Sequence, residues 1–285
     1  MSSKHPYLGM SASIATMHGK EKVMSPIFHR WLGMQLYRCI SVDTDQFGTF
    51  TGEIPRIDTM LETARKKARE AVRQSGCAIG LGSEGSFGPD PHMPFLASGT
   101  EAILLYDSLM DHEIYVQRRT RTNFDHIIIR PDEDPSTFLQ RVGFPNHAII
   151  IKPENTDEPH DMIKGLTDPK SLHDNIRSMA RRSRTGRALI QTDMRAHLNP
   201  TRMSAIGIVT KHLVLRIMRL CPGCGLPGFG QSDVERGIPC AACGIPTSLT
   251  KADVYSCRRC GFSELRHIRS ESLRADPRYC VCCNP

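Results

Sequence analysis

Cys221-Pro222-Gly223-Cys224, Cys240-Ala241-Ala242-Cys243, Cys257-Arg258-Arg259-Cys260 and Cys280-Val281-Cys282-Cys283 are four Cys-x-x-Cys pairs within residues 221–285. A Cys-x-x-Cys turn places two thiolates where one tetrahedral metal ion can bind both, and two such turns complete a four-cysteine zinc site. The gaps at residues 225–239 and 261–279 match the spacing of zinc ribbons. The sequence therefore predicts two structural zinc ions, bound by these eight cysteines, in a tandem zinc-ribbon domain over residues 221–285.

The spacing favours one zinc ion for the first two pairs and another for the last two. An interleaved arrangement that joins the first and third pairs stays open. Four cysteines fill a tetrahedral coordination sphere, so we expect neither zinc ion to be catalytic. Of the other cysteines, Cys39 and Cys77 lie alone in apolar stretches, and Cys282 is not needed as a ligand.

The chain has 285 residues, and no stretch reaches the roughly 18 apolar residues of a membrane span. Its first residues form no apolar leader. We therefore predict a soluble, cytoplasmic protein that does not bind membranes, in which disulfides are disfavoured. The sequence does not indicate an oligomeric state.

The formal net charge of +7 is distributed unevenly. Residues 1–150 carry a net charge of −1, residues 151–220 carry +6 and residues 221–285 carry +2. A zinc ion bound by four thiolates adds −2, so two of them bring residues 221–285 to about −2. The basic excess lies instead in residues 177–187, where a solvated helix face and a nucleic-acid contact are the alternatives.

Residues 1–220 alternate between strand-like and helix-like patterns, which predicts an α/β domain: a three-layer mixed sheet with flanking helices. A clear helix extends from Asp58, its expected N-cap, to a stop at Gly76. The longest helix starts at Asn199-Pro200, with Arg202 off its apolar stripe, and leads into Cys221. The predicted strands cover residues 13–17, 37–42, 78–81, 101–106, 114–117, 126–130, 147–152 and 188–192.

Three polar segments follow predicted strands, where ligands of α/β folds gather. In the first, residues 16–20, Lys20 and His18 are candidates to bind a phosphate. The alternative is that this segment is an ordinary turn between a strand and a helix. The second, residues 83–88, lies in an expected glycine-rich turn at 82–88 and would expose the Glu84 carboxylate and the hydroxyls of Ser83 and Ser86. The alternative is a purely structural turn. The third, residues 192–197, brings together an acid, an Arg and a His that could act on a ligand. The alternative is that these residues only cap the neighbouring helix. The candidates of this third segment are Asp193, Arg195 and His197.

Carboxylates are the second feature that suggests chemistry. The loop of residues 43–53 holds three acids, and they could share a magnesium ion with Glu62 and Glu84. Magnesium prefers one or two carboxylates together with phosphate oxygens of a substrate. Glu62 has an alternative role as an i,i+4 partner of Lys66 on a solvent-exposed helix face.

Over nearly its whole length, the chain resembles an uncharacterised bacterial family of unknown function with C-terminal Cys-x-x-Cys pairs. The resemblance rests on residues 18–22, 45–53, 83–88, 192–203 and 283–285 taken together. It implies no established activity.

Residues 11–107 also resemble the inosine-triphosphate-pyrophosphatase-like enzymes, which hydrolyse non-canonical nucleotides. The matching features are the Lys20 loop, Glu62-Thr63-Ala64-Arg65-Lys66-Lys67-Ala68, the Glu84-Gly85 turn and a later strand that ends in Asp107-Ser108. The resemblance implies that Lys20 binds phosphate, that Glu62 and Glu84 bind magnesium, and that a metal-activated water is the nucleophile. The chain departs from that family at Thr63, where the family has Asn, and no base-recognition signature follows.

Two functions follow from these patterns. The first is a magnesium-dependent hydrolase or transferase, pyrophosphatase-like, that acts on a phosphorylated small molecule such as a nucleotide; Glu84, Asp193 and His197 are its candidate catalytic residues. The second is a zinc-ribbon module that contacts nucleic acid or a protein partner, with the α/β domain as a scaffold or ligand sensor. The basic residues of this second hypothesis are Arg258, Arg259, Arg266, Arg269 and Arg274.

Overall fold

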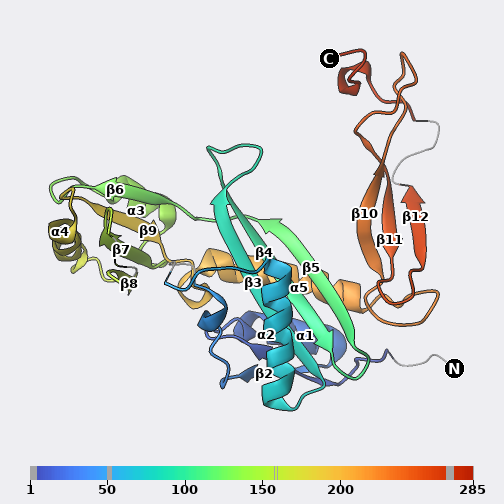
Figure 1. Cartoon of the computed structure of the whole chain (residues 1–285), viewed down its shortest axis with the longest axis horizontal. Helices are drawn as coiled ribbons and strands as arrows, with labels where there is room; N and C mark the ends of the chain where they lie inside the picture. The colour runs from blue at the N-terminus through green and yellow to red at the C-terminus, as the bar shows by residue number, and fades with distance from the viewer. Residues whose placement is uncertain (1–4, 50–52, 157, 159, 268–272, 285) are drawn as a thin grey trace. The chain divides into compact units, whose positions relative to one another are not determined.

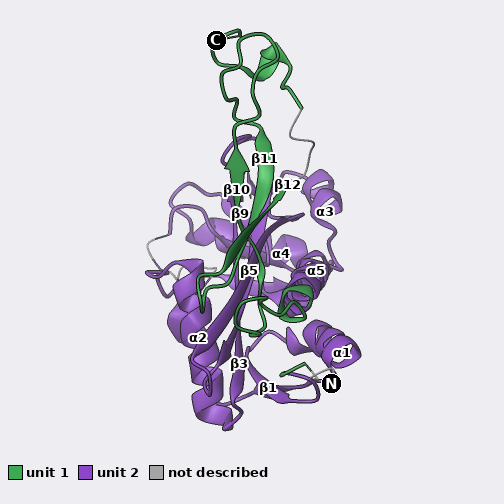
Figure 2. Cartoon of the chain, turned by 90° about the vertical axis from the view of Figure 1, so that its right-hand side faces the viewer, with its two compact units in different colours: residues 1–6, 215–285 green, residues 7–214 purple. Residues whose placement is uncertain are grey.

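The computed structural model describes residues 5–49, 53–156, 158, 160–267 and 273–284. It confirms the mixed α/β class, followed by a small unit that carries the cysteine pairs. The chain divides into two compact units, residues 7–214 and residues 1–6 with 215–285 (Figure 2). The boundary after residue 220 stays a prediction. No helix of the described residues is long and apolar enough to cross a membrane.

Five helices and twelve strands are named here by their bounds (Figure 1). The helices are α1 (Glu21–Leu32), α2 (Met60–Ser75), α3 (Ser136–Val142), α4 (Leu172–Arg182) and α5 (Pro200–Ile217). The strands of the larger unit are β1 (Ser11–Ala15), β2 (Gln35–Cys39), β3 (Ile79–Pro89), β4 (Ala97–Asp107), β5 (His112–Thr120), β6 (His126–Ile129), β7 (Ile149–Pro153), β8 (Ile163–Leu166) and β9 (Ala188–Thr192). Those of the smaller unit are β10 (Gly230–Arg236), β11 (Thr250–Ser256) and β12 (Ser263–His267).

The strands of the larger unit form two sheets. The first has the order β2-β1-β3-β4-β5, with β1 parallel to β2 and β3, and β3, β4 and β5 antiparallel. Helix α2 covers one face, and α1 and α5 lie on the other (Figures 1 and 2). The chain moves outward from β1 to β2 and then back past β1 to β3. This change of direction is the switch point at which α/β sheets bind ligands.

Helix α2 lies directly on β3 because the strand has glycines where they touch. A Cβ atom added at Gly82 would lie 1.9 Å from the carbonyl oxygen of Ala64, and one at Gly80 would lie 2.1 Å from that of Ala68. Each glycine therefore faces helix backbone that cannot move aside. The predicted stop at Gly76 is confirmed, but the N-cap is Thr59 and not Asp58, because the Thr59 side chain accepts the Glu62 N–H.

The predicted glycine-rich turn at residues 82–88 is wrong. Strand β3 continues to Pro89 and pairs with β4 along its whole length. Strand β1 pairs with β3 only as far as Leu81, so the edge of β3 beyond that point is covered by side chains. Lys20 donates to the carbonyl oxygen of Ser83 at 3.0 Å, and Arg56 to that of Gly85 at 2.8 Å.

The second sheet has the order β6-β9-β7-β8 and is antiparallel throughout. Its apolar core includes Ile149, Ile151 and Ile190 of the strands, together with Phe138 of α3 and Ile176 of α4. Strands β6, β7 and β9 match predicted strands, whereas β8 and α3 were not predicted because each is short and has no strong apolar period.

The smaller unit is built on an antiparallel meander of order β10-β11-β12. The first Cys-x-x-Cys pair precedes β10, the second lies between β10 and β11, the third between β11 and β12, and the fourth after β12. Because each strand carries the chain to the opposite end of the sheet, the first and third pairs share one end, and the second and fourth share the other.

We expect Gly82→Ala to lower the free energy of unfolding by about 1–3 kcal/mol or more, because its methyl group overlaps the backbone of α2. Gly88→Ala, in the same strand, is the control, since no atom lies within 4 Å of a Cβ added there. Urea denaturation of both variants measures the difference. Equal losses would show that the α2 contact does not set the fold.

Candidate functional site

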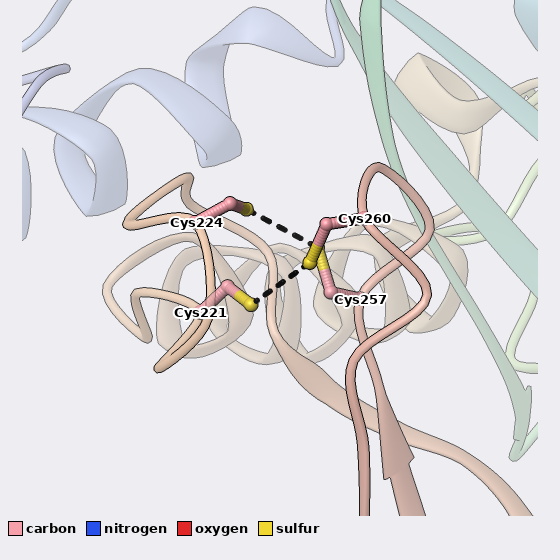
Figure 3. Close-up of side chains that lie close together, drawn as sticks. All are labelled: Cys221, Cys224, Cys257 and Cys260. Atoms are coloured by element: carbon pink, nitrogen blue, oxygen red, sulfur yellow. Dashed lines mark hydrogen bonds between the residues drawn. The ribbon is translucent and has the colours of Figure 1, made fainter.

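The first metal centre brings together the first and third Cys-x-x-Cys pairs. The Sγ atoms of Cys221 and Cys260 lie 3.6 Å apart, and those of Cys224 and Cys257 lie 3.7 Å apart (Figure 3). A tetrahedral zinc ion with Zn–S bonds of about 2.3 Å needs sulfur atoms about 3.8 Å apart. The four thiolates therefore fit a structural zinc ion.

The second centre joins the second and fourth pairs. Its Sγ distances are 3.9 Å between Cys240 and Cys283 and 3.6 Å between Cys243 and Cys280. The predicted pairing of neighbours along the sequence is wrong, and the interleaved arrangement is found. The meander explains this result, since a whole strand, β10 or β12, separates the pairs that the spacing would join.

Each pair forms the same local turn. The N–H of the residue after the second cysteine donates to the carbonyl oxygen of the first cysteine, at 2.8–3.0 Å. At three of the four turns this residue is a glycine with positive φ: Gly225, Gly244 and Gly261. At the fourth it is Asn284. The glycines fit this left-handed conformation because they have no side chain.

Two double variants test the pairing. Cys224→Ser with Cys260→Ser removes two ligands from one interleaved centre, so we expect one zinc ion per chain to remain. Cys224→Ser with Cys243→Ser removes one ligand from each centre, so we expect both zinc ions to be lost to a chelator. All three cysteines are exposed, which limits damage to packing. Zinc content by atomic absorption after chelator dialysis is the measurement, and the opposite pattern would show sequential pairing.

A cavity of about 440 Å³ in the larger unit is the second site. Its lining comes from the end of β1, residues of the segment 44–56 that follows β2, the uncovered edge of β3, and strands β7, β8 and β9 of the other sheet. The structure brings together here seven of the residues that the sequence singled out: His18, Lys20, Ser83, Glu84, Asp193, Arg195 and His197.

Glu62 does not line this cavity. It lies in the first turn of α2, where its side chain accepts the Thr59 N–H at 3.0 Å and completes a capping box. These hydrogen bonds to Thr59 hold the pKa of its carboxyl below the ordinary value. The expected magnesium site shared by Glu62 and Glu84 does not fit this arrangement. Among the described residues, the groups of three or more metal-binding side chains are the two cysteine quartets.

Glu84 is surrounded by cations. Its carboxylate accepts a hydrogen bond from Lys67, and Arg56 lies 3.8 Å away. Burial raises the pKa of this carboxyl, but Lys67 and Lys20 outweigh that effect, so the pKa is lowered. Glu84 therefore remains ionised and orients the cations on this wall of the cavity.

Asp193 has a similar role on the opposite wall. Its fully buried carboxylate forms a two-pronged ion pair with Arg195, with a shortest N–O distance of 2.6 Å. It also accepts the N–H of Gly165 at 3.1 Å, which ties β8 to the turn after β9. We conclude that Asp193 fixes the guanidinium of Arg195 at the cavity wall.

Two histidines face each other across the cavity. The rings of His18 and His197 stack with centroids 5.1 Å apart and an angle of 23° between their planes. Burial, together with the charges of Lys20 and His197, lowers the pKa of His18 to about 3. Burial and Arg195 lower the pKa of His197 as well. Both rings are therefore neutral at pH 7 and can each donate one hydrogen bond to a ligand and accept another.

Lys20 is the unusual cation of this site. Its Nζ donates to the carbonyl oxygen of Ser83 at 3.0 Å and to Ser83 Oγ at 3.3 Å, and within the described part of the chain it forms no ion pair. Burial, and next the charge of Arg202, lower the pKa of Lys20 to about 7. A lysine ammonium has three donors. One N–H is therefore left for a ligand.

Sequence reasoning missed four other cations of the lining: Arg56, Lys67, Lys164 and Arg202. Arg202 was placed off the apolar stripe of α5, yet it is buried and forms a 2.7 Å ion pair with the buried Glu101 of β4. Lys67 belongs to α2, and only its contact with Glu84 shows that it points inward. No local signal separates it from its exposed neighbour Lys66.

The stability of Lys20→Met tests whether Lys20 is a buried ammonium without a counterion. An ammonium that is buried without a counterion destabilises the fold, so we expect the variant to gain about 1–4 kcal/mol below pH 7. The unfolded chain holds the Lys20 proton up to pH 10.5, whereas the folded chain releases it near pH 7. Wild-type stability should therefore rise with pH across this window, and the advantage of the variant should shrink.

Chemical denaturation at pH 6 and pH 9 measures both effects. Lys66→Met, which removes an exposed lysine paired with Asp58, is the control and should change stability by less than about 0.5 kcal/mol. If Lys20→Met were destabilising at both pH values, the role of Lys20 would be to cap the edge of β3.

Comparison with known proteins gives one match. No curated protein and no solved structure matches the chain, and the resemblance to inosine-triphosphate-pyrophosphatase-like enzymes is not shown. A family model described as "Domain of unknown function (DUF6671)" matches residues 67–285. This range includes most of the cavity wall formed by β3, β7 and β9, and all eight cysteines of the metal centres. The chain therefore belongs to DUF6671, a family of unknown function.

Proposed function

We propose that the protein binds a phosphorylated small molecule in the cavity of its larger unit and acts on it as a hydrolase or transferase. The observation that carries this proposal is the buried Lys20, a cavity cation that has no carboxylate partner among the described residues. A bound anion would supply the missing counterion. Ligand binding would then stabilise the buried ammonium of Lys20, which destabilises the fold when no anion is bound.

The charges of the lining support a phosphate rather than a neutral ligand. Its basic side chains are Lys20, Arg56, Lys67, Lys164, Arg195 and Arg202, and its carboxylates are Asp45, Glu53, Glu84 and Asp193. Three of the carboxylates pair with neighbouring cations: Glu84 with Lys67, Glu53 with Lys164, and Asp193 with Arg195. The cations are thereby held in place, and hydrogen bonds between cations and phosphate oxygens are among the strongest in proteins.

The size and the apolar part of the cavity support a small molecule with a flat or apolar portion. A volume of about 440 Å³ lies in the range of ordinary ligand pockets. Met17, Phe124 and Ile150 add apolar surface to the polar lining. A nucleotide has both properties, since it joins a phosphate to a planar base.

The expected magnesium ion is not part of this proposal. Glu62 lies outside the cavity, and Glu84 is already neutralised by Lys67 and Arg56. Fixed cations can stabilise the charge that develops on a phosphate during its transfer. The neutral rings of His18 and His197 are placed to move protons.

A binding and turnover screen tests the proposal. Nucleotides, sugar phosphates and pyrophosphate are titrated into zinc-loaded protein by calorimetry, with and without magnesium, and phosphate release is followed in parallel. We expect at least one ligand to bind, and Lys20→Met to weaken it about tenfold or more, because a hydrogen bond to a charged group is worth about 1.5–3 kcal/mol. Lys66→Met should bind as the wild type does.

Two outcomes would count against the proposal: no ligand binds, or Lys20→Met binds as well as the wild type. The competing function uses the zinc-binding unit, where the guanidinium of Arg266 lies 4.1 Å from the ring centre of Tyr255, an arrangement suited to stacked bases. Its charge of about −2 with zinc disfavours a phosphate backbone. Binding of a single-stranded oligonucleotide that weakens with salt, in a protein without small-molecule ligands, would favour that function.

A further inference from the structure

We propose that Ser83 is the nucleophile of this site, that it forms a covalent phosphoserine intermediate, and that Lys20 is its general base. This inference rests on the proposed function and adds to it a reaction class and two catalytic roles. The observation behind it is the hydrogen bond between Lys20 Nζ and Ser83 Oγ, inside a cavity that both side chains line.

The two groups are held rigidly. Lys20 begins helix α1, and its Nζ is fixed by a second hydrogen bond, to the carbonyl oxygen of Ser83. Ser83 lies in β3 and pairs with Ile103 of the neighbouring strand. Both residues are buried, with 6% and 2% of their surface exposed. A nucleophile and a base at this distance, each fixed by backbone structure, form the arrangement that activates a serine hydroxyl.

Burial gives Lys20 the ability to act as a base. An ordinary lysine is protonated at neutral pH and has no lone pair to accept a proton. The pKa of about 7 leaves a large fraction of Lys20 neutral under the same conditions. The other described lysines and arginines of the lining are held in ion pairs. Among the described residues, the amine of Lys20 is the base that lies within hydrogen-bonding distance of Ser83 Oγ.

Three other hydroxyl groups of the lining have different partners. Thr16 Oγ1 accepts the His18 N–H at 3.2 Å, Thr49 Oγ1 accepts the Ile54 N–H at 3.1 Å, and Thr192 Oγ1 accepts the Asp125 N–H at 3.2 Å. Ser83 is the hydroxyl that the lysine amine contacts. Cations also surround its position, since Arg56 donates to the next carbonyl oxygen on the same edge of β3. They can stabilise the phosphoryl oxygens as charge develops on them.

The reaction balances with water as the only co-substrate. Ser83 Oγ attacks phosphorus while its proton moves to the neutral Lys20 amine. The P–O bond to the leaving group breaks, and the leaving oxygen takes that proton from the ammonium. A water molecule then attacks the phosphoserine and gives a proton to Lys20, the P–Oγ bond breaks, and Ser83 Oγ takes the proton back. The sum is a phosphate ester plus water giving an alcohol plus phosphate.

An alkyl fluorophosphonate tests the pair without knowledge of the substrate. This probe phosphonylates activated serines and releases fluoride, and intact-protein and peptide mass spectrometry locate the adduct. We expect one adduct on Ser83 in the zinc-loaded wild type. Ser83→Ala should abolish it, and Lys20→Met should slow it at least about 100-fold, as for the loss of a general base. Ser86→Ala, which removes an exposed serine of the same strand, should leave it unchanged.

The pH dependence of the labelling rate shows whether Lys20 acts as a base or only forms a structural contact with Ser83. Labelling should accelerate as the pH rises through about 7, because the neutral form of Lys20 then accumulates. If Ser83 is not labelled, or if Ser83→Ala hydrolyses a bound phosphorylated ligand at the wild-type rate, the inference is overturned while the proposed function stands. Labelling of Ser83 that requires Lys20, in a protein that binds no phosphorylated ligand, would support the pair and overturn the proposed function instead.

Discussion

The close contact between α2 and β3 is the constraint on which the cavity depends. The glycines at positions 80 and 82 let the helix backbone rest on the strand, with no side chain between them. This contact brings Lys67 of α2 within hydrogen-bonding distance of Glu84 on β3. It also holds β3 against the sheet beyond the last residue of β1, where the edge of the strand becomes the wall of a ligand site. A wider spacing would separate this ion pair and leave the buried carboxylate with Arg56, which lies 3.8 Å away.

The electrostatics of the cavity follow from this arrangement. Glu84 and Asp193, which the sequence suggested as catalytic residues, pair with an ammonium and a guanidinium group and fix them at the surface of the cavity. Lys20 differs from these paired cations because its partner is the neutral Ser83. Its Nζ donates to the carbonyl oxygen of Ser83 at the edge of β3, beyond the point where β1 stops pairing with that strand. One buried amine thus both completes the sheet edge and is available to a ligand.

Much of this molecule could be predicted from local patterns. The Cys-x-x-Cys pairs, the Asn199 cap of α5 and the polar residues after β1 and β9 each depend on a few neighbouring residues, and the structure contains all of them. The errors involve partners that are distant in sequence. Arg202 has the position of a solvent-facing residue on its helix, and only Glu101, from another element, explains its burial. Gly82 was assigned to a turn, but it lies in β3 and allows α2 to pack closely on that strand. Local sequence does not show which element packs on a strand.

The interleaved cysteines also impose an order on the formation of the metal centres during synthesis. The quartet that ends at Cys260 can close before β12 has been made, whereas the other quartet must wait for Cys283, so Cys240 and Cys243 remain without their partners in the meantime. When the last pair has been made, a metal ion there would join the connection between β10 and β11 to the segment that follows β12. A metal ion at the second quartet would therefore bind after β10, β11 and β12 have all been made, whereas one at the first quartet could bind before β12 exists.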